Sequence, residues 1–97
     1  MSLPQFHPKA RDEFEKSVLF YDRRFPGLGL AFVIEVEVAV SFALAHPEAG
    51  VTIFSEFRRI VVHRFPFSIV YRTKGDIVYI VAVAHQRRHP DYWRERA

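Results

Sequence analysis

Apolar residues in the first quarter of the chain recur with the period of a helix. They follow one another at spacings of four, four, three and four residues: Ala10, Phe14, Val18, Tyr21 and Phe25. Such spacing places apolar side chains on one stripe of a helix, and Pro8 suits its first position. The Pro-Gly pair at 26–27 then ends it. Before this helix, the short apolar segment Leu3–Phe6 predicts an edge strand.

Residues 30–46 carry two competing patterns. Ile34, Val36 and Val38 alternate with Glu35 and Glu37, which is typical of a strand. A helical stripe fits the same residues: Phe32, Val36, Ala39 and Ala43. Seventeen residues without Gly, Pro or a turn cluster is long for a strand and ordinary for a helix. We therefore expect a second helix.

Both predicted helices leave apolar residues outside their stripes. Leu19 and Phe20 lie off the first stripe, and Ile34 and Val38 lie off the second. Two interpretations stay open for the second helix. It is either packed deeply inside the fold or covered on its outer surface by another chain.

The second half of the chain reads as three strands near 57–65, 67–73 and 76–85. Pro66 separates the first two, and Gly75 supplies the positive φ of a tight hairpin. The run Ile77–Ala84 is apolar on both faces, so we expect it to be the central strand. Pro90 starts a short terminal helix. The order β-α-α-β-β-β, with a short C-terminal helix, predicts one α+β domain over residues 1–97.

Composition narrows the functional classes. There is no cysteine, which excludes disulfides and thiolate chemistry. No apolar run approaches the roughly 20 residues that span a bilayer, and the chain does not begin with a basic region followed by an apolar run, so we expect a cytoplasmic protein without a membrane partner. Residues 1–50 carry five Lys/Arg against seven Asp/Glu, whereas residues 51–97 carry nine against four. The basic second half predicts an acidic partner, either nucleic acid or an acidic protein segment; the alternative is a solvated basic face.

The polar residues after the last strand are the candidate site. Arg87 and Arg88 are suited to binding phosphates or carboxylates. His85 could act as an acid or base, or could orient a loop by hydrogen bonding. Arg72, near the hairpin turn, need not meet His85. We expect no cofactor and no metal, because His85 and His89 lack a third ligand.

Several segments together resemble the RelE/ParE superfamily of bacterial toxins, in its ParE-like, plasmid-stabilisation branch. They are Arg11-Asp12-Glu13, residues 26–29, His46-Pro47-Glu48, Phe65–Arg72 and His85–Trp93. The resemblance implies a helical hairpin packed on a small antiparallel sheet. It also implies a toxin that a cognate small antitoxin neutralises. We expect the antitoxin to cover the exposed apolar residues Leu19, Phe20, Ile34 and Val38, and the toxin to form a homodimer without it.

The family implies two mechanisms. ParE-like members inhibit DNA gyrase by binding it, and here the target-binding residues would be Arg87, Arg88, Tyr92 and Trp93. Tyr92 and Trp93 also suit packing of the terminal turn against the sheet. RelE-like members cut messenger RNA on the ribosome, for which the candidates are Arg72, His85, Arg87 and Tyr92. Ser68 stands where the nuclease members often have an arginine, so the sequence favours gyrase binding without catalysis. A degenerate member that only binds its antitoxin is the remaining alternative.

Overall fold

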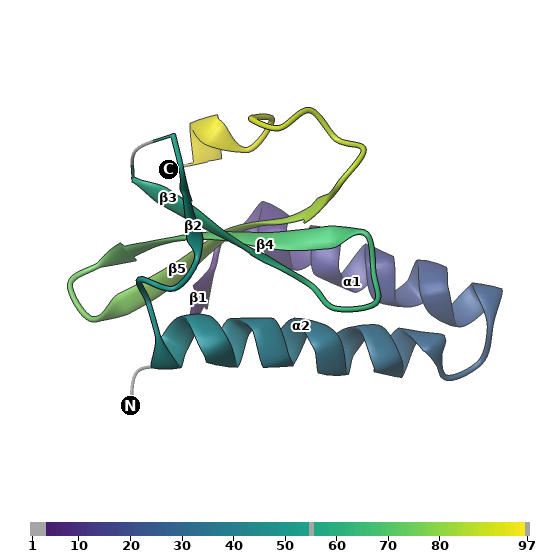
Figure 1. Cartoon of the computed structure of the whole chain (residues 1–97). Coiled ribbons are helices and arrows are strands. Elements are labelled where there is room, and N and C mark those ends of the chain that lie inside the picture. Colours follow the sequence, from purple (N-terminus) through teal and green to yellow (C-terminus); the bar gives the residue numbers. More distant parts are fainter. Residues whose placement is uncertain (1–3, 55, 97) are drawn as a thin grey trace.

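Two helices cover one face of a sheet, and the C-terminal segment covers the other (Figure 1). The structure is a computed structural model that describes residues 4–54 and 56–96. Within those residues the elements are β1 (Gln5–Phe6), α1 (Pro8–Arg24), α2 (Leu28–Ala45), β2 (Val51–Ile53), β3 (Phe57–Val61), β4 (Phe67–Lys74), β5 (Ile77–His85) and the 3-10 turn η1 (Arg94–Arg96). The spatial order of the strands is β1-β5-β4-β3-β2.

The predicted α+β fold is confirmed, with corrections to the sheet. Residues 51–53 form β2, a strand too short to show an alternating pattern. β3 ends at Val61, whereas the sequence predicted a strand to residue 65. β1 pairs with β5 in parallel, so the sheet is mixed. Leu3, placed in the predicted edge strand, lies outside the described residues.

Two further expectations about the sequence's last third need correction. β4, not β5, is the middle strand of the described sheet, because β2 and β3 extend it on one side. β5 is nevertheless buried over most of its length, since both its faces are covered. The expected C-terminal helix is only the 3-10 turn Arg94–Arg96.

α2 is a helix, as its unbroken length predicted. Its predicted stripe is buried in full, and Gly29 and Val40 are buried beside it. Among the described residues, α2 is the one helix whose length and composition would also allow it to cross a bilayer, which the sequence analysis had not recognised. In this fold six of its residues pack into the core. A core helix passes the same test of length and composition.

The α1–α2 connection depends on two glycines. Gly27 has φ 90°, a left-handed conformation that favours glycine, and its N–H donates to Asp22 Oδ1 at 3.1 Å. At Gly29 an added Cβ would lie 2.7 Å from the carbonyl oxygen of Val18. The helices therefore approach closely only because residue 29 lacks a side chain. Phe25, which the sequence placed on the α1 stripe, is exposed because its backbone is already extended.

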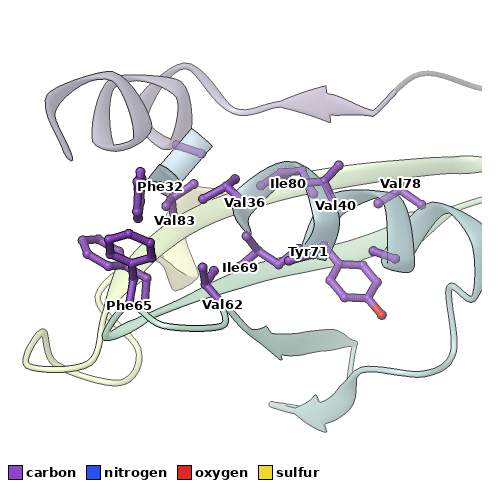
Figure 2. Packing of buried hydrophobic residues seen from close by; sticks show 14 residues of the cluster. Phe32, Val36, Val40, Val62, Phe65, Ile69, Tyr71, Val78, Ile80 and Val83 are labelled. Carbon is purple, nitrogen blue, oxygen red and sulfur yellow. The ribbon is translucent and has the colours of Figure 1, made fainter. Parts of the chain in front are cut away.

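The main core lies between the helices and the sheet (Figure 2). Phe32 of α2 packs edge-on against Phe65 and Phe67, with ring centroids 5.1 and 5.0 Å apart. Tyr21 of α1 joins the same group at 4.9 Å from Phe65. Such edge-to-face pairs add to the stabilisation from burial alone.

A second, smaller core lies on the opposite face of the sheet. Trp93 is 1% exposed and packs against Phe57, with ring centroids 4.7 Å apart. Val70, Val81 and Ala82 complete this cluster. The C-terminal segment thus covers the sheet face that the helices leave open, as its position above the sheet in Figure 1 shows.

Candidate functional site

The β4–β5 hairpin separates two of the candidate residues, as the sequence predicted. Arg72 pairs in register with Tyr79 near the turn, whereas His85 pairs with Phe67 at the other end of the hairpin. Arg72 lies 3.8 Å from Glu56 and 5.9 Å from the ring of Tyr79. Arg72 and His85 therefore cannot act on one group of a substrate.

His85 orients the loop that follows β5. Its Nδ1 accepts a hydrogen bond from the Arg87 N–H at 3.0 Å, and its ring packs edge-on against Phe67. The His85 carbonyl accepts from the Arg88 N–H at 3.0 Å. These bonds fit the loop-orienting interpretation of His85, and its acid–base role stays a prediction.

Arg87 and Arg88 are exposed on this loop. The Arg87 side chain makes no hydrogen bond or ion pair with the described residues, whereas the Arg88 guanidinium lies 3.8 Å from the centroid of the Tyr92 ring. Arg88 also lines a concavity of about 290 Å³ on the sheet face opposite the helices. Its polar lining includes Arg59, Ser68, His85 and His89. This arrangement offers cations to an acidic surface or a phosphate.

The side chains of Tyr92 and Trp93 make structural contacts within the fold. The Tyr92 hydroxyl donates to Glu13 Oε2 at 2.7 Å. Burial, then the hydrogen bond to Glu13 and its charge, raise the pKa of Tyr92 well above the usual range of a phenol. Trp93 is buried against the sheet, which confirms its predicted packing role and corrects its predicted role as a target anchor. The target-binding role of the other residues stays a prediction.

Glu13 and Arg96 were missed as a pair by the sequence analysis. Their side chains form a double hydrogen bond, with Arg96 donating from both terminal nitrogens to the two Glu13 oxygens at 2.9 Å. Burial disfavours the charge of Arg96, but the hydrogen bond and charge of Glu13 outweigh it and the pKa of Arg96 is raised. No local pattern could have found two partners that are 83 residues apart.

The comparison with known families decides the identity. The model of the ParE toxin of the type II toxin–antitoxin system parDE matches residues 5–90. The chain belongs to the ParE toxin family. That match covers both helices and the whole sheet together with the Arg87–Arg88 loop. The resemblance inferred from the sequence segments is confirmed.

A solved structure shares the fold of this ParE-family toxin. It is described as a chromosomal ParDE toxin–antitoxin system from P. aeruginosa, with a TM-score of 0.74 and 22% sequence identity. The alignment covers 88% of this chain and 96% of that chain. No curated protein matches the sequence.

Membership of a type II toxin–antitoxin family makes a cognate antitoxin the partner of this ParE-family toxin. The residues predicted to bind it all lie at the surface of the helical hairpin. Their exposed fractions are 55% for Leu19, 50% for Phe20, 50% for Ile34 and 58% for Val38. Leu30 and Phe42 extend the same α2 series at intervals of four residues and are also exposed. α2 is thus apolar on its outer side as well as in the core.

Proposed function

We propose that this ParE-family toxin inhibits DNA gyrase by binding it through the loop that carries Arg87 and Arg88, without cleaving RNA. The observation that carries the proposal is that the two predicted acid or base groups, His85 Nδ1 and the Tyr92 hydroxyl, are both engaged in structural hydrogen bonds. The exposed arginines, in contrast, remain available to a partner. Gyrase binding would place the protein in the cytoplasm.

RNA cleavage by attack of a 2′-hydroxyl requires a base for that hydroxyl and an acid for the leaving oxygen. His85 uses Nδ1 to accept the Arg87 N–H, and Arg72 lies at the far end of the hairpin. The Tyr92 hydroxyl is bonded to Glu13 and its raised pKa opposes ionisation. These contacts leave the predicted nuclease candidates without an acid–base pair around one reactive position.

Binding needs no such pair. Arginines are frequent in the centre of protein interfaces, where a guanidinium can both stack and form two parallel hydrogen bonds with a carboxylate. Arg88 is already stacked on Tyr92, which lowers the entropy lost when it binds. Arg87 is beside it on the same ordered loop.

The test compares three variants in a DNA supercoiling assay and in cells. Arg87→Ala combined with Arg88→Ala is expected to abolish gyrase inhibition and growth arrest without unfolding the protein. His85→Ala is expected to keep most of the toxicity. Arg64→Ala is the matched control, since Arg64 is an exposed arginine on the loop between β3 and β4. Toxicity should coincide with a DNA-damage response while translated messages remain intact.

Cleavage of ribosome-bound messages in phase with codons, lost on His85→Ala, would reverse the choice in favour of the nuclease. Absence of both activities, with antitoxin binding retained, would identify a degenerate member.

We also propose that the antitoxin covers the exposed apolar residues Leu19, Phe20, Ile34 and Val38, and that two toxin chains associate through them when it is absent. The exposed apolar residues of α2 lie close together at intervals of four residues, and such an apolar surface is often covered by a partner. The basic groups beside Phe20, including Arg24 at 4.8 Å from its ring, favour an acidic amphipathic segment.

The matched experiment places charges on this surface. Ile34→Lys with Val38→Lys should abolish copurification with the antitoxin and convert the isolated toxin to a monomer, with little change in thermal stability. Thr73→Lys, an exposed position on β4 outside the proposed apolar surface, is the control for added charge. Unchanged antitoxin binding by the double variant would refute this location of the interface.

A further inference from the structure

Glu13 is at the centre of a polar cluster that joins three distant parts of the chain. The side chain of Glu13 is 15% exposed and that of Arg96 is 11% exposed. Besides the two bonds from Arg96, Glu13 Oε1 accepts from the Val83 N–H at 3.1 Å and Oε2 from the Tyr92 hydroxyl at 2.7 Å. We call Glu13, Tyr92 and Arg96 the Glu13 clamp. It connects α1, β5 and the C-terminal segment.

The clamp occupies an open edge of β5. β1 pairs with only two β5 residues, Tyr79 and Ile80. Beyond them the edge has no neighbouring strand among the described residues, and side chains supply the missing partners. Glu13 accepts from the Val83 N–H, and Arg96 donates to the Val81 carbonyl at 3.3 Å. These bonds satisfy backbone groups that would otherwise be free to pair with another strand.

A β-bulge aims Val81 at this edge. The register with β4 steps from Ile80 to Ala82, so Val81 has no partner on β4. A bulge of this kind turns the backbone of the extra residue away from its regular orientation. The Val81 carbonyl is thereby available to Arg96. The clamp thus depends on the sheet geometry as well as on Glu13.

The clamp also reaches the proposed target-binding loop. Arg88 and Arg96 both place their guanidinium groups over the ring of Tyr92, at 3.8 and 4.9 Å from its centroid. The hydroxyl of that ring is held by Glu13. Glu13 therefore fixes Tyr92, and Tyr92 fixes the plane on which Arg88 stacks. Glu13 itself lies on α1 and is not part of the exposed loop.

Stability alone is a weak reason for such a cluster. A buried ion pair recovers little more than the desolvation of its two charges, and apolar residues of similar size often stabilise a fold equally well. A carboxylate with four hydrogen bonds, however, fixes the directions of its partners. The chemistry therefore suits positioning better than it suits a gain in folding free energy.

We infer that Glu13 is a positioning residue, which holds Arg88 in its binding orientation through Tyr92 and so is required for full toxicity. This inference rests on the proposed role of the Arg87–Arg88 loop in binding the target. It adds a residue from the opposite end of the chain to that role.

A double-mutant cycle tests the inference on the full-length toxin, with Glu13→Gln, Arg88→Ala and the two together. Inhibition of supercoiling and the toxin level that arrests growth are measured for each variant. Glu13→Gln alone is expected to weaken inhibition of supercoiling about tenfold and to raise the toxin level that arrests growth by about the same factor. A tenfold change corresponds to about 1.4 kcal/mol. In the Arg88→Ala background, adding Glu13→Gln should reduce inhibition and toxicity less than about twofold further, because Glu13 acts through Arg88. Equal losses in both backgrounds would overturn the inference, since general destabilisation adds independently.

Tyr92→Phe covers the case in which Glu13→Gln does not fold. It keeps the ring under Arg88, creates no unpaired buried charge and removes only the bond to Glu13. We expect a loss of about threefold, smaller than that of Glu13→Gln because the bonds of Glu13 to Arg96 and Val83 remain. Full activity of a folded Tyr92→Phe protein, whose loop exchanges as slowly as in the wild type, contradicts the inference. Glu15→Gln, an exposed neutralisation on the same helix, is the matched control.

Hydrogen exchange separates this inference from the proposed function. In Glu13→Gln the amides of residues 86–92 should exchange at least several-fold faster, while the amides of α2 keep their protection. Unchanged exchange in that loop refutes the positioning role whatever the target. If the wild type does not inhibit gyrase, the proposed target is wrong, and the cycle on growth arrest together with hydrogen exchange still decides the role of Glu13.

Discussion

Tyr71 shows how a single buried hydroxyl fixes the connection between α2 and β2. It is fully buried in the middle strand, and its hydroxyl donates to the Pro47 carbonyl at 2.9 Å. The same oxygen accepts from the Gly50 N–H at 3.2 Å. An added Cβ at Gly50 would lie 2.7 Å from that oxygen, so the close approach requires glycine. Figure 2 shows the Tyr71 ring among the core residues, on the side of the core away from Phe65.

Tyr71→Phe should lower the free energy of unfolding by about 1–3 kcal/mol, because it leaves the buried Gly50 N–H without its acceptor. Urea denaturation followed by circular dichroism measures the change, with an unchanged m-value. Tyr79→Phe is the matched control, since the Tyr79 hydroxyl makes no hydrogen bond to a described residue. Equal stability of the Tyr71→Phe protein and the wild type would contradict the structural role of the hydroxyl.

Among the elements, the C-terminal segment matters more than its short 3-10 turn suggests. The helices cover one face of the sheet, and Trp93 covers the other by packing against Phe57. Phe54 adds an edge contact to the same indole at 5.8 Å. The Arg87–Arg88 loop is therefore anchored on both sides, by β5 before it and by Trp93 after it.

Trp93→Ala should lower the free energy of unfolding by about 3–5 kcal/mol, the usual loss when a buried large aromatic is truncated. It should also speed hydrogen exchange in the Arg87–Arg88 loop. Phe25→Ala provides the control, because this exposed aromatic should change stability by less than about 0.5 kcal/mol. A small loss from Trp93→Ala, similar to that of the control, would show that the second core contributes little.

Charge is divided unevenly over the whole molecule. The half that contains both helices carries two more acidic than basic residues, and the other half carries five more basic than acidic ones. The proposed target surface lies in the basic half and is cationic, whereas the proposed antitoxin surface is mainly apolar with a few basic side chains beside Phe20. The two interactions should therefore respond differently to salt.

Raising the ionic strength from about 0.05 M to about 0.5 M should slow association with gyrase at least tenfold, because screening weakens electrostatic steering. Binding to the antitoxin should change less. Surface plasmon resonance with each partner measures both rates, and Arg87→Ala with Arg88→Ala should flatten the salt dependence for gyrase. Identical salt dependence for both partners would contradict the assignment of separate surfaces.

The sequence by itself determined the helical hairpin and the main turn. The α2 stripe was visible because helical periodicity is a local property, and the unbroken length of residues 30–46 outweighed the alternation around Ile34. Gly75 has φ 60°, which the hairpin between β4 and β5 requires. The separation of Arg72 and His85 followed from that hairpin alone. The expected exposure of Leu19 and Phe20 is also confirmed, because both residues lie off the buried stripe of α1.

Tertiary structure alone decided the parallel pairing of β1, the bulge at Val81 and the Glu13 clamp. None of these has a local signature. A strand of two residues shows no period, and the partner of a carboxylate depends on which segments the core brings together. Glu13 and Arg96 are in contact because α1 packs along β5 and because Trp93, by packing on the sheet, holds the C-terminal segment over it. Packing, which acts between residues far apart in sequence, makes them neighbours.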